Sequence, residues 1–331
     1  MSKGGRVGIK FVSTGRYLPD KVLTNFDLEK MVDTSDEWIR TRTGIKERRI
    51  APSEMATSDM VTEAARIALD RANLKPEDID CIIVATVTPD NAYPSTACWV
   101  QKNLGLKHFP AFDIEAACSG FLYGVIVAKS LLESKAATRV LVSGAETMSR
   151  AVNWEDRETC VLFGDGAGVA ILELSNDESD ILSYNWAADG NLGELLIQPA
   201  GGSRLPPSHE TIDKKLHSVF MQGADVFKNA VRWMADSAER ALRDAGMTKD
   251  DIDLYIPHQA NIRIIESTIK RVGIPKEKTV ITIDRFANIS AATVPIAIDC
   301  AVEEGRLKRG DIVLLNTFGG GFTWGAMVVK W

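Results

Sequence analysis

The sequence predicts an α/β fold made of two duplicated halves, and two observations support this. First, short apolar runs rich in β-branched residues, such as Cys81–Thr88, alternate with amphipathic stretches of helical length. Such alternation is typical of parallel strands covered by helices. Second, Ala65 to Asp80 and Ala238 to Asp253 share a pattern of alanines ending in Asp-Ile-Asp, 173 residues apart. An internal repeat of this kind indicates a duplicated unit.

Composition limits the classes of protein that this chain can be. Its 331 residues, 45% hydrophobic and 25% charged, are those of a soluble globular protein with room for two domains. A net charge of −6 argues against nucleic-acid binding, and no apolar run is long enough to span a membrane. Met1–Val7 is not a signal peptide and is expected to be disordered. Five scattered cysteines without a C-x-x-C pair suggest a reducing cytoplasm and no metal site.

Elements of the first half follow from the spacing of apolar residues. The expected strands are Gly8–Leu18, Cys81–Thr88, Ala111–Ile114 and Val140–Ser143. The expected helices are a short one capped at Thr24, one capped by Ser35 or Thr34, then Ser58–Asn73, Thr96–Leu104 and Ser119–Leu132. The last is almost wholly apolar, so we expect it to be buried on all sides.

The glycine-rich segment Phe163–Gly168 is interpreted as a turn that permits close backbone approach. It lacks the Walker lysine and the G-x-G-x-x-G spacing, which argues against a nucleotide cradle. The acidic segment Ser175–Asp180 is the expected junction between the halves, residues 1–175 and 176–331.

The second half repeats the same order. Its expected helices are Val219–Ala245, Asn261–Val272 and Ala291–Val302, the last with Pro295 in its first turn. Its expected strands are Leu254–Pro257, Thr279–Asp284, Ile312–Leu315 and Ala326–Val329. Gly201–His217, rich in Gly, Ser and Pro, is expected to be a mobile loop.

Cys118 stands where a strand gives way to the buried helix, at or just before the helix N-terminus. Free backbone N–H groups and the positive end of the helix dipole favour a thiolate there, so we expect a lowered thiol pKa. Gly120 leaves room for a ligand near the sulfur. The alternative is a small buried apolar residue, which describes most free cysteines.

Three other features follow strands of the second half: His258, Asn288 and the glycine run inside Thr317–Trp324. Each has an ordinary structural explanation when taken alone, as a structural histidine, a helix cap and a turn. In the repeat, however, Asn288 matches Cys118 to within one residue, so these corners are expected to meet. Together they suit acyl transfer, with a thioester on sulfur, His and Asn donating to an enolate oxygen, and glycine N–H groups forming an oxyanion hole.

The cations between Arg40 and Arg49 add a local anion-seeking patch to an acidic chain. The ordinary explanation of such a run is a solvated face.

Six segments together resemble β-ketoacyl-acyl-carrier-protein synthase III of type II fatty acid synthesis, and the resemblance covers nearly the whole chain. They are Asp33–Ile45, Asp113–Phe121, Phe163–Gly168, Pro257–Arg263, Asp284–Pro295 and Phe318–Trp324. The resemblance implies a thiolase-like fold with mixed sheets in α-β-α-β-α layers, and a cytoplasmic homodimer without a cofactor. It also implies a decarboxylative Claisen condensation. An acyl-CoA primer, expected to be acetyl-CoA, acylates the cysteine, and malonyl-acyl-carrier protein then yields 3-ketoacyl-acyl-carrier protein, CoA and CO2.

The resemblance also implies roles for single residues. Cys118 would be the nucleophile, His258 and Asn288 would promote decarboxylation, and the oxyanion hole would combine the N–H groups of Cys118 and Gly320. The residues implied to contact CoA are Thr34, Trp38, Arg42, Arg157 and Asn261. Those implied to dock the acidic carrier protein are Lys228, Gln259, Ala260, Asn261, Ile262 and Arg263. The acyl pocket would comprise Phe163, Met221, Phe318 and, from the partner subunit, the residue equivalent to Tyr93.

One motif departs from the family pattern Gly-Asn-Thr-Ser, because here Asn288 lies between Ala287 and Ile289. We expect these bulkier neighbours to shift the Asn288 backbone or narrow the site.

Four related enzymes and one binding protein are alternatives. Thiolases need a second cysteine, elongating synthases a second histidine, and plant-type polyketide synthases are longer. A relative that builds specialised metabolites from another acyl-CoA stays open. A non-catalytic scaffold that binds CoA or carrier protein is disfavoured because Cys118, His258 and Asn288 are all present.

Overall fold

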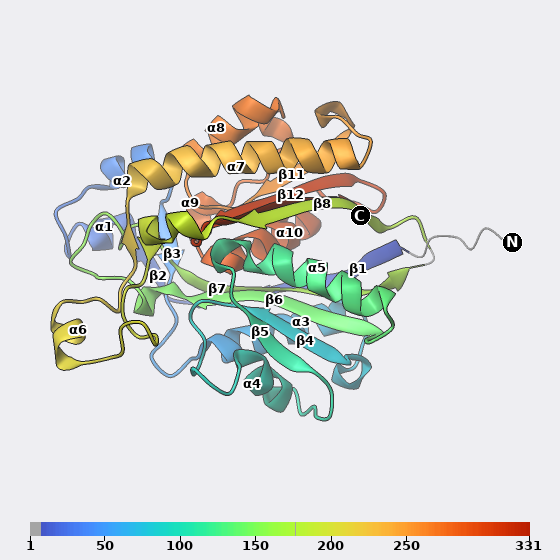
Figure 1. Cartoon of the computed structure of the whole chain (residues 1–331), viewed down its shortest axis with the longest axis horizontal. Helices are drawn as coiled ribbons and strands as arrows, with labels where there is room; N and C mark the ends of the chain where they lie inside the picture. Colours follow the sequence, from blue (N-terminus) through green and yellow to red (C-terminus); the bar gives the residue numbers. More distant parts are fainter. Residues whose placement is uncertain (1–7, 176) are drawn as a thin grey trace, which may run out of the picture.

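Two mixed sheets with helices on both faces build five layers (Figure 1). The computed structural model describes residues 8–175 and 177–331, so the expectation for Met1–Val7 lies outside the described residues. The first sheet has the order β1 (Gly8–Tyr17), β7 (Asp165–Ser175), β6 (Arg139–Thr147), β4 (Cys81–Ala85) and β5 (Ala111–Ile114). The second has the order β11 (Leu254–Pro257), β12 (Ile312–Gly319), β13 (Thr323–Lys330) and β8 (Asp180–Ala188).

Three pairs of helices complete the layers. Between the sheets lie α5 (Gly120–Glu133) and α10 (Thr293–Glu303). The outer face of the first sheet carries α3 (Thr57–Arg71) and α4 (Thr96–Asn103), and that of the second carries α7 (Gly223–Asp244) and α8 (Ile262–Val272). The smaller elements are β2 (Val22–Thr24), α1 (Asn25–Leu28), α2 (Asp36–Thr43), β3 (Glu47–Arg49), β9 (Leu196–Ile197), α6 (His209–Asp213), β10 (Phe220–Met221) and α9 (Ile283–Phe286).

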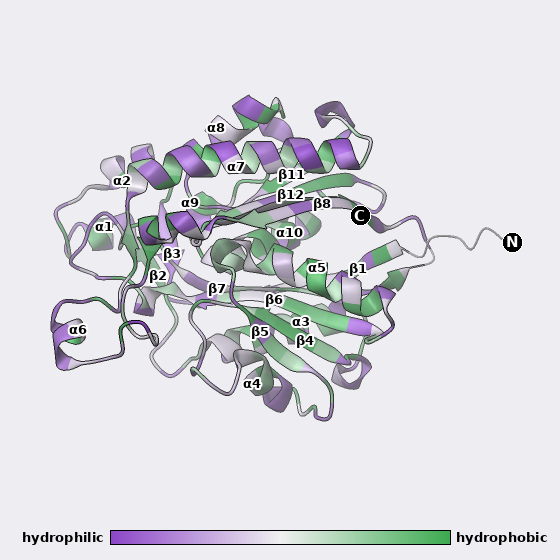
Figure 2. Cartoon of the chain, in the orientation of Figure 1, coloured by the Kyte–Doolittle hydropathy of each residue, from purple (hydrophilic) through white to green (hydrophobic). Residues whose placement is uncertain are grey.

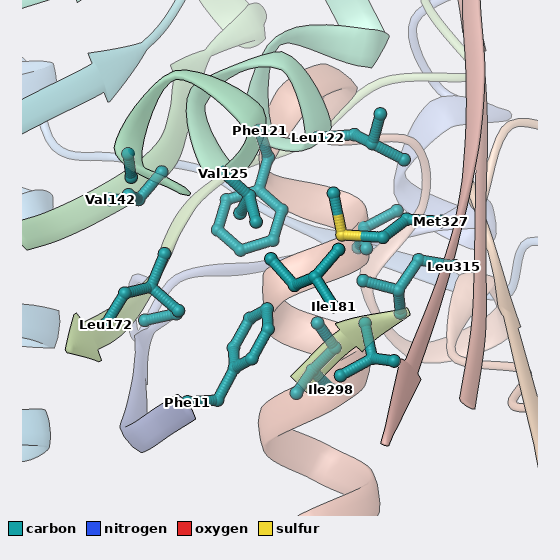
Figure 3. Packing of buried hydrophobic residues seen from close by; sticks show 14 of the residues in the cluster. Phe11, Phe121, Leu122, Val125, Val142, Leu172, Ile181, Ile298, Leu315 and Met327 are labelled. Atoms are coloured by element: carbon teal, nitrogen blue, oxygen red, sulfur yellow. The ribbon is translucent and has the colours of Figure 1, made fainter. Parts of the chain in front are cut away.

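The position of each helix follows from its apolar pattern. In α7 the buried side chains, such as Val226, Ala230 and Met234, recur every four residues along one face. Figure 2 accordingly shows alternating hydrophilic and hydrophobic bands along α7 and a more uniformly hydrophobic α5. Helix α5 is largely buried because both of its faces meet sheets, as the sequence predicts. Phe121 and Leu122 pack with side chains of both sheets in the central core (Figure 3).

The repeat is visible in the strand register. Cys81 pairs with Val140 in one sheet and Leu254 with Val313 in the other, and both pairs are parallel. Each member of the second pair lies 173 residues after its counterpart. The same offset relates the 3-10 turns that open the two central helices, Ala117–Ser119 and Ser290–Ala292. Cys118 therefore corresponds to Ala291, and the expectation that it matches Asn288 to within one residue is wrong.

Two expected elements differ in the structure. Gly166 and Gly168 lie within β7 rather than in a turn, because α10 packs directly on this strand. A Cβ atom on Gly168 would lie 2.7 Å from the Ile296 nitrogen. Thr279–Asp284 is not a strand: Thr279 forms a single bridge to Tyr255 before α9 begins. The N–H groups of Thr282 and Ile283 donate to the Gln259 side chain, which removes them from a strand ladder.

Two other expectations concern loops and membranes. The expected loop Gly201–His217 contains α6, which is capped by Ser208. Among the described residues, no helix is both long enough and apolar enough to cross a membrane.

Candidate active site

A single cavity of about 1510 Å³ brings together most of the residues singled out from the sequence. It is lined by side chains from both halves, among them Trp38, Arg42, Cys118, Arg157, Phe163, Met221, His258, Ala260, Asn261, Arg263, Asn288, Phe318 and Gly320. The residues that do not line it are Thr34, Tyr93, Lys228, Gln259 and Ile262. The lining therefore offers both cations and apolar groups, which suits a ligand that is partly anionic and partly apolar.

Cys118 lies in the 3-10 turn that precedes α5, with its side chain buried. Burial raises the pKa of the Cys118 thiol to about 12, while hydrogen bonding with Ser290 acts in the opposite direction. The expectation of a lowered pKa is therefore wrong, because desolvation penalises the thiolate more than the helix start favours it. The thiol must lose its proton as the sulfur attacks, which calls for a proton acceptor in the cavity.

The glycine run passes directly over Cys118. A Cβ atom on Gly319 would lie 2.6 Å from the Cys118 nitrogen, so only glycine fits there. The Thr323 hydroxyl lies near the carbonyl oxygens of both Ala116 (2.8 Å) and Gly320 (3.1 Å). This contact ties the glycine run to the residues before Cys118 and places Gly320 on the cavity wall.

His258 follows β11 and is held by two hydrogen bonds. Its backbone N–H donates to the Asn316 carbonyl at 2.7 Å, and its Nδ1 lies 2.6 Å from the Thr293 hydroxyl oxygen. The other ring nitrogen, Nε2, is left for the cavity. Burial lowers the pKa of His258 to about 3, so the imidazole is neutral at pH 7.

Asn288 is fixed by its backbone and by one side-chain oxygen. Its N–H donates to the Leu162 carbonyl, its own carbonyl accepts from Gly164, and its Oδ1 accepts from the Ser290 N–H at 2.8 Å. The Nδ2 amino group remains as a hydrogen-bond donor for a ligand in the cavity.

The neighbours of Asn288 do not narrow the site, so that expectation is corrected. Neither Ala287 nor Ile289 lines the cavity. Ile289 packs away from it, in a cluster with Phe286 and Ile296. The strain falls on Ala287, whose φ of 59° and ψ of −160° belong to a region that is essentially restricted to glycine.

Replacing Ala287 with glycine is therefore expected to raise the free energy of unfolding by about 1 kcal/mol, since relief of strain outweighs the lost methyl burial. Chemical denaturation of Ala287→Gly beside the wild type measures this. Ala292→Gly is the matched control: Ala292 is also buried but has φ near −78°, so its replacement should destabilise. A destabilised Ala287→Gly would show that methyl packing dominates.

Glu146 is a buried residue near the site that the sequence analysis missed. It lies on β6, and its carboxylate accepts from the backbone N–H groups of Val87 and Thr88 and from the hydroxyls of Thr86 and Thr88. Burial nevertheless raises the pKa of Glu146 to about 7. The signal in the sequence that could have revealed Glu146 is a carboxylate residue within an otherwise apolar strand. Glu146 anchors the loop that begins at Thr86, part of which lines the cavity.

Glu146→Gln is expected to change how stability depends on pH. Between pH 4.5 and 7 the folded wild type keeps a proton that the unfolded chain loses, so Glu146 lowers the unfolding free energy as pH rises. His258 raises the free energy of unfolding as pH rises over the lower part of this range, so the variant is compared with the wild type at each pH. The unfolding free energy of the variant minus that of the wild type should rise by up to about 1.4 kcal/mol per pH unit. Denaturation from pH 4.5 to 8 measures it; the exposed Glu239→Gln should run parallel to wild type, and a parallel Glu146→Gln would contradict the assignment.

A cation–aromatic arrangement forms another part of the lining. The guanidinium carbons of Arg42 and Arg157 lie 5.5 Å and 5.2 Å from the Trp38 ring centroid. Arg157 also donates to the Asp33 carbonyl at 2.8 Å. Ser35, rather than Thr34, caps α2, and the buried Thr34 hydroxyl has no hydrogen-bond partner within residues 8–175 and 177–331. A flat heteroaromatic group carrying phosphates suits this arrangement.

The six expected docking residues differ in how they are placed. Lys228 and Arg263 are exposed, and Arg263 lies over the Phe227 ring. Ala260 and Asn261 line the cavity, and Asn261 Oδ1 caps α8. The expectation that Gln259 docks the carrier protein is wrong for its side chain, which is buried and hydrogen-bonded to Pro257, Val280, Thr282 and Ile283. Ile262 packs against Gly44 and so joins α8 to the end of α2.

Tyr93 does not line the cavity of its own chain, and 88% of its surface is exposed. The segment around it is anchored at both ends. Asp90 accepts from Ser58, and Asp113 accepts from the N–H groups of Thr96 and Ala97. The neighbouring strand β5 is the last of its sheet, and none of the described residues pairs with its outer edge.

Comparisons with known proteins agree with one another. Residues 112–190 match the family model 3-oxoacyl-[acyl-carrier-protein] synthase III, and residues 242–331 match its C-terminal counterpart. The chain is 55% identical over 326 residues to β-ketoacyl-[acyl-carrier-protein] synthase III of Caldanaerobacter subterraneus, with 98% of each chain covered. It resembles the crystal structure of 3-oxoacyl-[acyl-carrier-protein] synthase III from Aquifex aeolicus with a TM-score of 0.90 and 50% identity, covering 98% and 100%. A priming β-ketosynthase of a polyketide pathway also gives a TM-score of 0.90, at 30% identity and with 99% and 98% covered.

Proposed function

The chain belongs to the β-ketoacyl-[acyl-carrier-protein] synthase III family, and on that premise we propose that Cys118, His258 and Asn288 perform its reaction. The protein has the thiolase fold of that family. It is a condensing acyltransferase of fatty acid synthesis, which joins an acyl-CoA primer to malonyl-acyl-carrier protein with loss of CO2. The observation that carries the residue assignment is that the three side chains come from different parts of the chain and all line one cavity.

In the first half-reaction, the Cys118 sulfur attacks the thioester carbon of the primer and CoA leaves as a thiol. The N–H groups of Cys118 and Gly320 donate hydrogen bonds to the carbonyl oxygen and stabilise the negative charge that develops on it. Trp38, Arg42 and Arg157 bind the nucleotide end of CoA, Asn261 contacts its pantetheine arm, and Thr34 lies nearby. This use explains why cations gather beside an aromatic ring in an acidic protein.

In the second half-reaction, malonyl-acyl-carrier protein occupies the same cavity and loses CO2. His258 and Asn288 hydrogen-bond to its thioester oxygen and stabilise the enolate that forms. The carbanion attacks the acyl group on Cys118, which gives 3-ketoacyl-acyl-carrier protein and frees the sulfur. Phe163, Met221 and Phe318 surround the acyl chain. The reaction needs no bound cofactor.

Docking of the acidic carrier protein uses Lys228 and Arg263, which are exposed cations near the cavity. Ala260 and Asn261 meet the pantetheine arm where it enters, and Ile262 supports them through its contact with α2. The buried Gln259 side chain cannot contact the carrier protein and acts only by holding the protein backbone in place.

A homodimer in the cytoplasm completes the pocket. The open edge of β5 invites pairing with a second copy. Tyr93, exposed on an anchored segment, then closes the acyl pocket of the partner. Each subunit consists of two thiolase-like halves, residues 1–175 and 176–331. Sedimentation should give twice the 36.2 kDa of one chain, and a single-chain mass would contradict this arrangement.

The function is tested by incubating the protein with malonyl-acyl-carrier protein and acetyl-, propionyl-, isobutyryl- or octanoyl-CoA. Mass spectrometry of the carrier protein then identifies the 3-ketoacyl product. We expect product from acetyl-CoA, which initiates fatty acid synthesis. Product from octanoyl-CoA alone would instead support a condensing enzyme of specialised metabolism. No product and no covalent adduct with any primer would overturn the assignment.

A further inference from the structure

The Thr293 hydroxyl makes two contacts at the start of α10, and only one of them can use its proton. It lies 3.1 Å from the Ser290 carbonyl oxygen and 2.6 Å from His258 Nδ1. A carbonyl oxygen can only accept, so a hydroxyl that donates to Ser290 must accept at its other contact. His258 Nδ1 is then the donor and carries a proton.

A neutral imidazole has a single N–H, which fixes the state of the opposite nitrogen. Burial lowers the pKa of His258 to about 3, so the ring is neutral at pH 7. With the proton on Nδ1, Nε2 presents a lone pair to the cavity that Cys118 also lines. The buried Cys118 thiol stays protonated at neutral pH. The Nε2 lone pair is the proton acceptor that the sulfur needs when it attacks the primer.

The duplicated fold shows that this contact is particular to the second half. At the repeat offset of 173 residues, Ala85 corresponds to His258 and Gly120 corresponds to Thr293. A Cβ atom on Gly120 would lie 2.9 Å from the Ala85 Cβ, so the equivalent contact in the first half is close apolar packing. The second half has replaced it with a buried hydrogen bond between two polar side chains.

We propose that Thr293 is a positioning residue that fixes the tautomer of His258, with the proton on Nδ1 and Nε2 free to exchange a proton with Cys118. This inference rests on the proposed roles of Cys118 and His258. As the Cys118 sulfur forms its bond to the primer carbonyl, its proton passes to Nε2 and then to the departing CoA sulfur. The imidazole returns to its starting form.

The same nitrogen serves the second half-reaction, which consumes one proton overall. That proton comes from solvent and binds Nε2 when the malonyl carboxylate enters, because its negative charge favours the imidazolium, and Nε2–H then donates to the malonyl thioester oxygen. It passes the proton to the Cys118 thiolate that the condensation releases. Throughout, Nδ1–H donates to Thr293 and Thr293 donates to Ser290, so the ring does not have to turn between the two steps.

Nitrogen-15 NMR of the resting enzyme tests the tautomer directly, and the chain has only four histidines to resolve. His258→Gln identifies the signals of His258. We expect wild type and Thr293→Ser to show a protonated Nδ1 and a bare Nε2. Thr293→Val, which keeps the shape but loses the hydroxyl, should lose this preference. A wild type with its proton on Nε2 overturns the proposal, and this readout stands even if no primer proves to be a substrate.

Acylation kinetics supply the second readout. Thr293→Val should acylate Cys118 about tenfold to a hundredfold more slowly, and Thr293→Ser should restore the rate. Thr268→Val is the matched control, because Thr268 is equally buried, lies on α8 and has a hydroxyl that bonds to none of the described residues. It should keep the wild-type rate. If Thr293→Val unfolds, Thr293→Ala is measured in its place; a wild-type rate with an unchanged NMR spectrum in either variant refutes the role.

Discussion

Cys118→Ala is expected to abolish covalent acylation, which is the largest single effect that the structure predicts. Intact-protein mass spectrometry after mixing with acetyl-CoA should show an added acetyl group on the wild type and none on the variant. The reason is chemical: alanine has no atom that can form the thioester. Because the side chain is small and buried, its loss leaves the fold in place, and circular dichroism can check this.

The matched control for this prediction is Cys98→Ala. Cys98 is more exposed than Cys118, yet it does not line the cavity, and its sulfur contacts the Ser95 hydroxyl and the Ala111 carbonyl. If general reactivity governed acylation, Cys98 would be the preferred site. An adduct that persists in Cys118→Ala and disappears in Cys98→Ala would refute the assignment of the nucleophile.

Much of the fold could be predicted because its signals are local. The alternation of strands and helices, the repeat and the buried character of α5 can all be seen as runs of apolar residues. The expected strand Thr279–Asp284 failed for a non-local reason. Val280 and Ile283 are buried, but the Gln259 side chain accepts the hydrogen bonds of the Thr282 and Ile283 N–H groups. The spacing of residues within the segment cannot show that a side chain from elsewhere will take these hydrogen bonds.

The site was predictable to the extent that reactive residue types follow predicted strands. Cys118, His258 and Asn288 do so, and the structure places all three on one cavity. The pKa of Cys118 was not predictable, because it depends on how completely other segments enclose the sulfur. Glu146 and Thr293 were missed for a related reason. Both act through partners distant in sequence, Thr86 to Thr88 for one and His258 for the other.

Asn288→Ala is expected to leave acylation of Cys118 intact and to slow condensation roughly one hundredfold to one thousandfold, the usual cost of removing one donor to a developing oxyanion. Single-turnover assays measure the two steps separately: primer transfer with acyl-CoA alone, then 3-ketoacyl-acyl-carrier protein formation from the preformed acyl-enzyme. Asn288→Asp sharpens the argument because its Oδ1 can still accept from the Ser290 N–H. It therefore keeps the turn but replaces the donor with a second acceptor, which repels an enolate oxygen. If Asn288→Asp condensed at the wild-type rate while Asn288→Ala did not, the residue would act by holding the turn, and the donor role would be wrong.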